Sequence, residues 1–372
     1  MTFCIITHVK HGLKNNSYFA YAPYVREMNV WSRYVDKIII VAPLNLTQKT
    51  EIDDYYSHPS IEFNQVKAFN FLSIFSTLQT VLQLPKITFT IYKAMQQSDH
   101  IHLRCPGNMG LLGCILQLFF PSKKKTSKYA GNWDLKAKQP LSYRIQKWIL
   151  NNTFLTKNMT VLVYGEWENS SINIKPFFTA SYYESDKIDI ATKDLSTDIN
   201  FVFVGSLTTG KNPMYAIKLI ENLKKKKFNI SLSIYGNGAE YDTLKEYIEQ
   251  KNLSSAIYLL GNKNQEEIKA AFIKSHFVIL PSKSEGWPKV LAEAMFWKCL
   301  PIATRVSCIP NMLDNGERGI LLTLNLENDV IQIEKLLLDE QNYQIISLKA
   351  EIWSRVYTLD YFQSEIKKIV AS

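Results

Sequence analysis

Short apolar runs recur along the chain, and each is separated from the next by a stretch with the periodicity of a helix. Clear examples are residues 37–43 (KIIIVAP) and 276–281 (HFVILP). Strands that are apolar on both faces are typical of a parallel sheet with helices on both sides. Because the strand–helix alternation is repeated throughout the 372 residues, we predict an α/β protein with two doubly wound parallel sheets.

The alternation weakens between residues 166 and 198, where the segment is polar with scattered aromatic residues. A loss of regular pattern of this kind is typical of a domain boundary. We therefore expect one domain at 1–185 and a second at 186–350. The remaining segment, 351–372, contains an amphipathic helix. The chain is long enough for two domains of ordinary size.

Charge and cysteine content narrow the class of partner. The net charge of +9 favours nucleic acid, an anionic membrane surface or phosphorylated small molecules. Nucleic acid is the weakest of these, because the sequence has neither zinc-ligand spacing nor RNA-binding aromatic signatures. The five scattered cysteines contain no CxxC pair, as expected of reduced thiols in the cytosol.

Two apolar segments bear on membrane insertion. The N-terminal run is too short for a signal peptide, so we expect none. The longest apolar helix candidate, residues 110–120, has about half the length that spans a bilayer. We expect a core helix there, and a membrane-facing patch is the alternative.

The stretch 282–304 (SKSEGWPKVLAEAMFWKCLPIAT) joins two of the apolar strands. Glu285 precedes a predicted helix, Glu293 lies inside it, and Gly286 and Pro288 mark the turn. Parallel α/β sheets bind ligands beyond the carboxyl ends of their strands. This turn is therefore placed where a ligand is expected.

Two other glycine-containing turns follow strands of the second half. Residues 205–211 (GSLTTGK) precede a helix, and a helix N-terminus with Lys211 nearby suits a phosphate group. Residues 235–238 (YGNG) are as well explained by a tight connection as by ligand contact. We predict that all three turns lie at one edge of one sheet, and this convergence is a stronger indication than any single turn.

The two glutamates leave three hypotheses open. They could be an acid and a base, as in glycoside hydrolysis. They could be surface residues, with Glu293 paired to Lys289 four residues earlier. They could accept hydrogen bonds from sugar or ribose hydroxyls. The basic surroundings favour an anionic, hydroxyl-rich ligand, and a nucleotide sugar is one.

The motifs of the second half resemble those of the retaining glycosyltransferases of family 4, which adopt the GT-B fold. The matching segments, in the right order and spacing, are 203–211, 235–248, 258–261, 278–295, 301–304 and 315–322. The first half is similar only in its strand–helix layout. The resemblance implies two Rossmann-like domains that face each other across a cleft, with the donor on the second and the acceptor on the first. It also implies that the helix in 351–372 packs on the first domain.

In that family the first Glu contacts the transferred sugar, the second contacts the ribose, and the lysine of the first turn contacts the donor diphosphate. These roles fall on Glu285, Glu293 and Lys211, so we assign catalysis to Glu285 and Lys211. The expected donor-binding residues are Gly205, Ser206, Gly236, Asn237, Gly238, Lys263, Gly286, Trp287, Lys289, Val290 and Glu293. Ser206 stands where the family usually has an arginine, which removes one positive charge from the diphosphate site.

The acceptor side is inferred from positions in the first half. A polar loop is expected at 8–17 after the first strand, and residues 129–134 (YAGNWD) stand where the family often has a histidine. The expected acceptor-binding residues are Lys10, His11, Gly12, His102, Arg104, Asn132, Trp133 and Asp134. For His102, a satisfied histidine at a strand end is the alternative.

The predicted function is retaining transfer of a sugar from a UDP- or GDP-linked donor to a glycan or lipid-linked acceptor. We place it in surface polysaccharide synthesis, in the cytoplasm or at the inner face of the membrane. No metal or further cofactor is expected, and Asp53–Asp54 is assigned to a loop. The alternatives are a nucleotide-sugar epimerase of GT-B architecture, which the spacing of the two glutamates disfavours, and a non-catalytic carbohydrate-binding protein, which Ser206 motivates.

Overall fold

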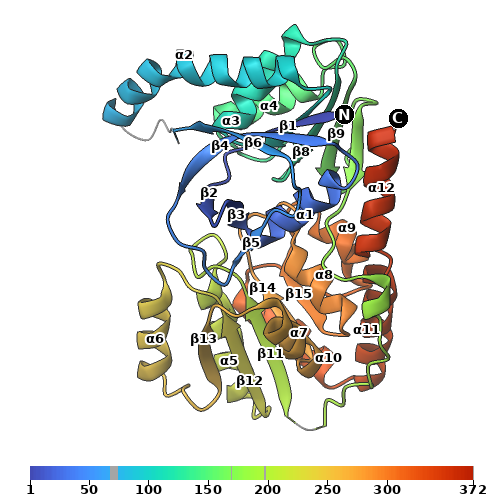
Figure 1. Ribbon diagram of the computed structural model, residues 1–372. Helices are drawn as coiled ribbons and strands as arrows, with labels where there is room; N and C mark the ends of the chain where they lie inside the picture. The colour runs from blue at the N-terminus through green and yellow to red at the C-terminus, as the bar shows by residue number, and fades with distance from the viewer. Residues whose placement is uncertain (68–73, 169, 197, 372) are drawn as a thin grey trace. The chain divides into compact units, whose positions relative to one another are not determined.

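The structure is a computed structural model that describes residues 1–67, 74–168, 170–196 and 198–371. The chain divides into two compact units (Figure 1). Unit 1 comprises Met1–Phe178 and Gln363–Ser372, and unit 2 comprises Thr179–Phe362. The boundary expected at 185/186 lies a short way beyond this division. Of the segment 351–372, only the last part belongs to unit 1.

Unit 1 is built on a ten-stranded mixed sheet. Its strand order is β10 (Ile174–Phe177), β9 (Met159–Tyr164), β8 (Lys124–Tyr129), β7 (His100–Cys105), β1 (Thr2–Ile6), β4 (Lys37–Leu46), β2 (His11–Lys14), β3 (Ser17–Tyr21) and β5 (Asp53–Tyr55), and β6 (Ile61–Val66) also pairs with β4. The strands from β10 to β4, together with β6, are parallel. The pairs β2–β3 and β3–β5 are antiparallel.

Helices cover this sheet on both sides. They are α1 (Ala22–Ser32), α2 (Ile74–Gln97), α3 (Asn108–Leu116), which continues into the 3-10 turn η1 (Gln117–Phe119), and α4 (Leu141–Leu150). The crossovers through α2, α3 and α4 advance in one direction across the sheet, so right-handed connections place these helices on the same face. Figure 1 shows them together on one side, with α1 on the other.

The N-terminal part of unit 1 differs from the expectation. Residues 8–17 are not a polar loop, because β2 and β3 form a hairpin there. Asn15 and Asn16 make its turn with φ of 51° and 59°, the left-handed conformation that two-residue hairpin loops favour. Asp53 and Asp54 are also not in a loop, because they belong to β5.

Unit 2 is built on a six-stranded parallel sheet. The strand order is β13 (Ile257–Gly261), β12 (Ile230–Tyr235), β11 (Ile199–Val204), β14 (Phe277–Leu280), β15 (Leu300–Thr304) and β16 (Ile320–Leu322). The chain runs from β11 outward to β13, then returns to place β14 on the other side of β11. The strand order therefore reverses between β11 and β14, and open α/β sheets bind ligands at such a reversal.

The helices of unit 2 follow the predicted alternation. They are α5 (Pro213–Lys225), α6 (Tyr241–Gln250), α7 (Gln265–Lys274), α8 (Lys289–Phe296), α9 (Ile309–Met312), α10 (Leu326–Leu337) and α11 (Glu340–Ser354), and α12 (Leu359–Ala371) begins in this unit. In unit 1, the end of α12 is bound by Lys124, whose Nζ donates to the carbonyl of Val370 at 2.8 Å. None of the described helices has both the length and the apolar character that a membrane span requires.

Candidate functional site

Backbone hydrogen bonds join the turns that follow β11, β12, β13 and β14 in unit 2. The amide of Gly205 donates to the carbonyl of Tyr235 at 2.9 Å, and the amide of Gly236 donates to that of Gly261 at 2.8 Å. The amide of Lys283 donates to the carbonyl of Gly210 at 2.8 Å. The prediction that the three glycine turns converge at one edge of one sheet is confirmed.

The packing of the turns at this edge explains why residue 236 is a glycine. A Cβ on Gly236 would lie 1.9 Å from the carbonyl oxygen of Gly205, and φ of Gly236 is +140°. A Cβ on Gly238 would lie 2.4 Å from the carbonyl oxygen of Leu207. The close approach of two turns therefore accounts for both glycines, as the tight-connection hypothesis expected, and neither position needs a ligand to explain it.

Lys211 and Glu285 meet where the strand order reverses. Nζ of Lys211 lies 2.6 Å from Oε1 of Glu285, and the glutamate side chain is 7% exposed while that of the lysine is 30% exposed. The two residues follow β11 and β14, which are adjacent in the sheet. The lysine has three N–H donors, so it can contact a ligand anion while it keeps the glutamate.

The turn that precedes α8 is held by one residue at the end of β15 and one shortly after it. Sγ of Cys308 donates to the carbonyl of Gly286 at 3.1 Å, and the hydroxyl of Thr304 donates to the carbonyl of Ser282. Pro288 lies just before α8 rather than in its first position. In the first turn of α8 the amides of Lys289 and Leu291 already donate to the carbonyls of Trp287 and Pro288, but the turn contains no acidic residue and lies at the positive end of the helix dipole. This end of α8 therefore suits an anion.

Glu293 faces a different set of partners from Glu285. Its Oε1 accepts from the hydroxyl of Ser181 and lies 3.8 Å from Nζ of Lys289. The second contact is the pair that the surface hypothesis expected four residues apart on the helix. In this structure Glu293 is therefore engaged locally and remains 21% exposed.

The other expected donor residues lie around the same edge in varied roles. Ser206 and Asn237 are exposed in their turns. Lys263 forms an ion pair with Glu267 at 3.0 Å. The ring of Trp287 stacks on that of Trp353, with centroids 6.1 Å apart. Val290 is partly buried against the core of unit 2.

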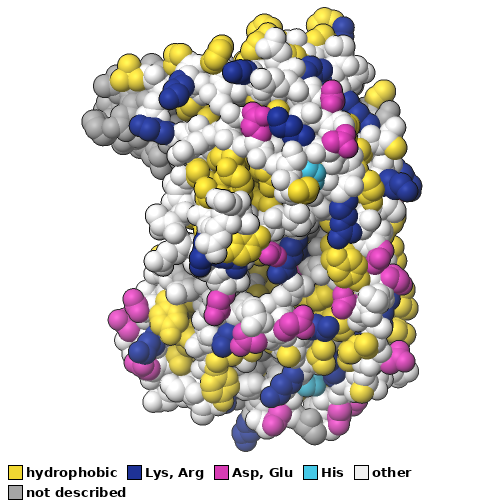
Figure 2. Space-filling model, in the orientation of Figure 1, with side chains coloured by type: hydrophobic (Ala, Val, Ile, Leu, Met, Phe, Trp, Pro, Cys, Tyr) yellow, Lys and Arg dark blue, Asp and Glu magenta, His cyan; other side chains and the backbone are white. Residues whose placement is uncertain are grey.

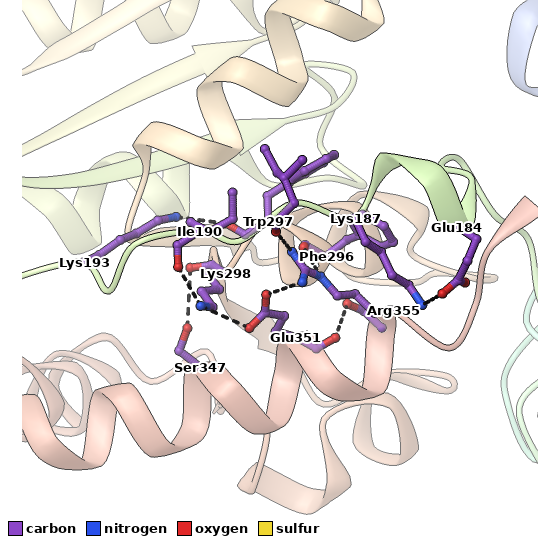
Figure 3. Close-up of polar contacts among 12 residues, drawn as sticks. Glu184, Lys187, Ile190, Lys193, Phe296, Trp297, Lys298, Ser347, Glu351 and Arg355 are labelled. Atoms are coloured by element: carbon purple, nitrogen blue, oxygen red, sulfur yellow. Dashed lines mark hydrogen bonds and ion pairs between the residues drawn. The ribbon is translucent and has the colours of Figure 1, made fainter.

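A cluster of charged side chains holds the C-terminal end of α8 in place (Figure 3). The sequence did not point to this cluster. The carboxylate of Glu351 lies 3.4 Å from Nζ of Lys298 and 2.9 Å from Nη1 of Arg355. The arginine also donates to the carbonyls of Phe296, at the end of α8, and of Ile188. The only sequence signal was the spacing of Glu351 and Arg355, which places them on one helix face.

The N-terminal hairpin of unit 1 buries two of the residues expected to bind the acceptor. His11 is fully buried, with Nδ1 2.8 Å from the carbonyl of Val9 and Nε2 2.8 Å from the hydroxyl of Tyr56. A Cβ on Gly12 would lie 2.2 Å from the ring of Phe19. Packing within unit 1 explains both residues, and the buried side chain of His11 is not accessible to an acceptor, contrary to the expectation. Lys10 is exposed.

His102 and Trp133 are also core residues. His102 is fully buried and shares a 2.9 Å hydrogen bond with the hydroxyl of Thr126. Burial, reinforced by His100 and Arg104, lowers the pKa of His102 well below its usual value. Trp133 is fully buried with its ring edge-on to Tyr129. His102 is therefore a buried strand histidine, as the alternative expected, although only Nδ1 is hydrogen-bonded and Nε2 has no partner among the described residues. Neither side chain reaches the surface.

The remaining expected acceptor residues stay partly accessible. Arg104 forms an ion pair with Glu27 at 3.2 Å, and its side chain is 13% exposed at the carboxyl end of β7. Asn132 and Asp134 shape a turn, because the amide of Asp134 donates to Oδ1 of Asn132 at 2.8 Å. Among the described residues, no group of three His, Cys, Asp or Glu side chains is placed to hold a metal ion.

Known proteins are similar to part of this chain. Residues 185–353 match the family Glycosyl transferases group 1. An uncharacterized glycosyltransferase of Methanocaldococcus jannaschii is 29% identical over 174 residues, which are 46% of this chain and 48% of that protein. The N-acetylgalactosamine-N,N'-diacetylbacillosaminyl-diphospho-undecaprenol 4-alpha-N-acetylgalactosaminyltransferase of Campylobacter jejuni is 31% identical over 154 residues, which are 41% of this chain and 40% of that protein. The chain thus spans less than half the length of these relatives.

Solved structures resemble the whole chain. HepE of Anabaena in complex with UDP has a TM-score of 0.71 at 12% identity and covers 100% of this chain and 99% of its own. Sucrose-phosphate synthase from Thermosynechococcus elongatus has a TM-score of 0.70 at 14% identity and covers 99% and 98%. The chain therefore has the GT-B fold of two Rossmann-like domains, and its residues 185–353 resemble the family Glycosyl transferases group 1.

Proposed function

We propose that the protein is a glycosyltransferase that moves a sugar from a nucleotide diphosphate donor to a hydroxyl of a glycan or lipid-linked acceptor. The observation that carries this proposal is the contact between Lys211 and Glu285 at the strand reversal of unit 2. A cation beside a helix N-terminus suits a diphosphate, and a neighbouring carboxylate suits sugar hydroxyls. The site therefore has complementary groups for both halves of a nucleotide sugar.

The reaction we propose retains the configuration of the sugar and needs no metal ion. The bond between the sugar and the diphosphate breaks, and the acceptor oxygen forms a bond to the same carbon on the same face. The acceptor proton passes to an oxygen of the leaving diphosphate, so no protein base is required. Lys211 and the amides around Gly286 stabilise the charge that develops on that leaving group. Glu285 orients the sugar hydroxyls, and Glu293 the ribose.

Because residue 206 is a serine, the binding of the donor diphosphate depends more strongly on the charge of Lys211. An exposed serine in the turn after β11 supplies no positive charge to the diphosphate. We propose that Lys211, with the positive end of the α8 dipole, supplies most of the charge stabilisation at this end of the donor.

The named relatives support a role in surface polysaccharide synthesis. The Campylobacter jejuni relative is named for a diphospho-undecaprenol substrate. A relative from Staphylococcus aureus, 26% identical over 159 residues, is named as a capsular polysaccharide biosynthesis glycosyltransferase. On the basis of these two names, we propose that the chain acts in the cytoplasm, at the inner face of the membrane, on a glycan or lipid-linked acceptor.

A panel of UDP- and GDP-linked sugars tests the donor. A donor that binds the native protein raises its melting temperature, because binding stabilises the folded state. The free nucleoside diphosphates and unrelated nucleotides serve as controls. If no nucleotide sugar shifts the melting temperature, the proposal is wrong. If a donor is converted without acceptor into its epimer as the sole product, the epimerase alternative replaces the transferase.

A further inference from the structure

The positive charge of the chain is concentrated in one segment. Residues 67–158 contain 13 Lys and Arg but only two acidic residues, Asp99 and Asp134. The rest of the chain contains 30 Lys and Arg against 32 Asp and Glu. The whole excess therefore belongs to the segment that forms α2, β7, α3, β8 and α4 of unit 1.

The helices of this segment expose large apolar side chains. Phe89 of α2 is 67% exposed, Phe119 of η1 is 66% exposed and Trp148 of α4 is 64% exposed. Phe154, shortly after α4, is 77% exposed. We call these four residues the apolar face. Single exposed apolar residues are ordinary, but four large ones on neighbouring helices and the turn after α4 indicate an interaction surface.

Contacts join α2, η1 and the turn after α4, three of the segments that carry the apolar face. The ring of Tyr92 on α2 lies 6.3 Å from the ring of Phe119 on η1. Nε2 of Gln117 on η1 donates to the carbonyl of Leu155 at 3.0 Å, which joins η1 to the chain beside Phe154. Figure 1 shows α2, α3 and α4 as one layer of unit 1, and Figure 2 shows apolar and basic side chains interspersed along that upper rim.

Exposed basic side chains accompany the apolar face. Lys86 and Lys93 lie on α2 and Arg144 on α4, and all three are exposed. Nζ of Lys157 lies 5.4 Å from the ring centroid of Phe154. Within the described residues, none of these four cations takes part in an ion pair. Their charge is therefore available to an anionic partner.

We propose that the apolar face and its basic neighbours dock on an anionic lipid bilayer. Trp and Phe rings insert at the boundary between headgroups and acyl chains, while Lys and Arg contact the lipid phosphates. Long basic side chains lay their methylene stems along the apolar layer and keep the charge at the headgroups. A second copy of the chain fits less well, because it would oppose two segments of the same strong positive charge.

The membrane-docking proposal depends on the proposed function in one respect only, which is the identity of the acceptor. A lipid-linked acceptor is presented at a bilayer, so docking would bring the transferase to its substrate. Vesicle binding, however, is measured without donor or acceptor, and the donor-induced shift in melting temperature is measured without vesicles. If vesicles are bound and no donor stabilises the protein, the membrane surface stands and the transferase proposal is lost. In the converse case only the membrane surface is lost.

Co-sedimentation with vesicles tests the proposal. We compare phosphatidylcholine vesicles with vesicles that contain equal parts of phosphatidylcholine and phosphatidylglycerol, at low and high salt. The protein should bind the anionic vesicles, and high salt should weaken binding, because it screens the lipid charge. The double variant Phe119→Ser with Trp148→Ser should weaken the partition constant by at least about tenfold. Lys93→Gln with Lys157→Gln should reduce binding and its dependence on salt.

Leu338→Ser is the matched control, because Leu338 is 73% exposed in unit 2 and should leave vesicle binding unchanged. All variants replace exposed side chains, so circular dichroism and melting temperature should match the parent. Equal binding of the parent to both vesicle types, or of the double variant and the parent to anionic vesicles, overturns the proposal. Size-exclusion chromatography completes the test. If the parent is a dimer, the double variant a monomer, and neither binds vesicles, a second copy covers this face and the proposal is wrong.

Discussion

Nζ of Lys211 lies 2.6 Å from Oε1 of Glu285, although 74 positions separate the two residues in the chain. They are neighbours because β11 and β14 are adjacent and parallel, so the turns that follow them share one edge of the sheet. The pair is partly buried, and the lysine retains some exposure through which it can meet a ligand. This contact is the core of the proposed donor site.

Lys211→Met should abolish donor binding. The methionine fills similar volume but contributes no charge to a diphosphate, and it leaves the carboxylate of Glu285 without its cation. We expect kcat/KM to fall by about a hundredfold or more, as for other preorganised electrostatic groups. We also expect the donor to lose its effect on the melting temperature. Lys211→Arg restores the charge and should recover part of both.

The control for this change is Lys245→Met, which removes an exposed lysine of α6 in the same unit. It should leave both the donor-dependent melting temperature and kcat/KM at the parental values. A donor response that survives Lys211→Met undiminished would remove Lys211 from the site.

Gly236→Ala should destabilise the edge of the sheet in unit 2. The added Cβ would lie 1.9 Å from the carbonyl oxygen of Gly205, so the two turns must separate. Crowding of this kind typically costs about 1–3 kcal/mol, and the positive φ adds about 1 kcal/mol. Chemical denaturation measures the loss of unfolding free energy.

Gly316→Ala separates the two contributions. Its φ is +124°, close to that of Gly236, but no atom lies within 4 Å of the added Cβ. This variant should therefore show only the cost of the backbone conformation, about 1 kcal/mol. Equal losses for both variants would mean that the contact between the turns contributes nothing.

The unit 2 fold and its ligand edge could be predicted from sequence for a physical reason. Strands such as β14 are apolar on both faces, and glycine turns punctuate their carboxyl ends, so local pattern and topology agree. The parallel arrangement then forces the turns to one edge without further information. The partners of each side chain at that edge, such as Ser181 for Glu293, depend on tertiary packing and could not be predicted.

The acceptor side shows where sequence reasoning fails. Polar and aromatic residues near strand ends were expected at the surface, but His11 and His102 are buried and bond to Tyr56 and Thr126, which are distant in sequence. No local pattern distinguishes a buried core histidine from a ligand-binding one. The hairpin at Asn15–Asn16, by contrast, carried a turn signal that the sequence did offer.

Glu351→Gln should strongly destabilise unit 2. The carboxylate of Glu351 is the acidic partner of both Lys298 and Arg355, and its side chain is 6% exposed. Its loss leaves two partly buried cations without compensation, and breaking a buried pair typically costs about 3–5 kcal/mol. We expect the lower end of this range, because glutamine keeps the shape and can still accept a hydrogen bond.

Glu317→Gln is the matched surface control. Glu317 pairs with Lys349 at 2.6 Å, but its side chain is 65% exposed. Exposed pairs contribute about 1 kcal/mol or less. Comparable losses of unfolding free energy in the two variants would show that the charges fixing the end of α8 add no more than a surface pair.

Lys128 should make the stability of unit 1 depend on pH. The side chain is fully buried, its Nζ donates to the carbonyl of Phe178 at 3.0 Å, and it lies 4.5 Å from the ring centroids of Tyr164 and Phe177. Burial lowers the pKa of Lys128 to about 7 from its ordinary value of 10.5. The folded state therefore disfavours the charged lysine, and unfolding takes up a proton at any pH between these two values.

It follows that the free energy of unfolding rises as the pH is raised from about 7 towards 10.5, and that the penalty is complete below about pH 7. Lys128→Met removes this contribution, so the melting temperature of the variant should climb less steeply with pH over that range. Lys136→Met, which replaces an exposed lysine of the same unit, should keep the parental slope. If the melting temperatures of Lys128→Met and of the parent rise equally with pH, burial does not lower the pKa of Lys128 in the folded protein.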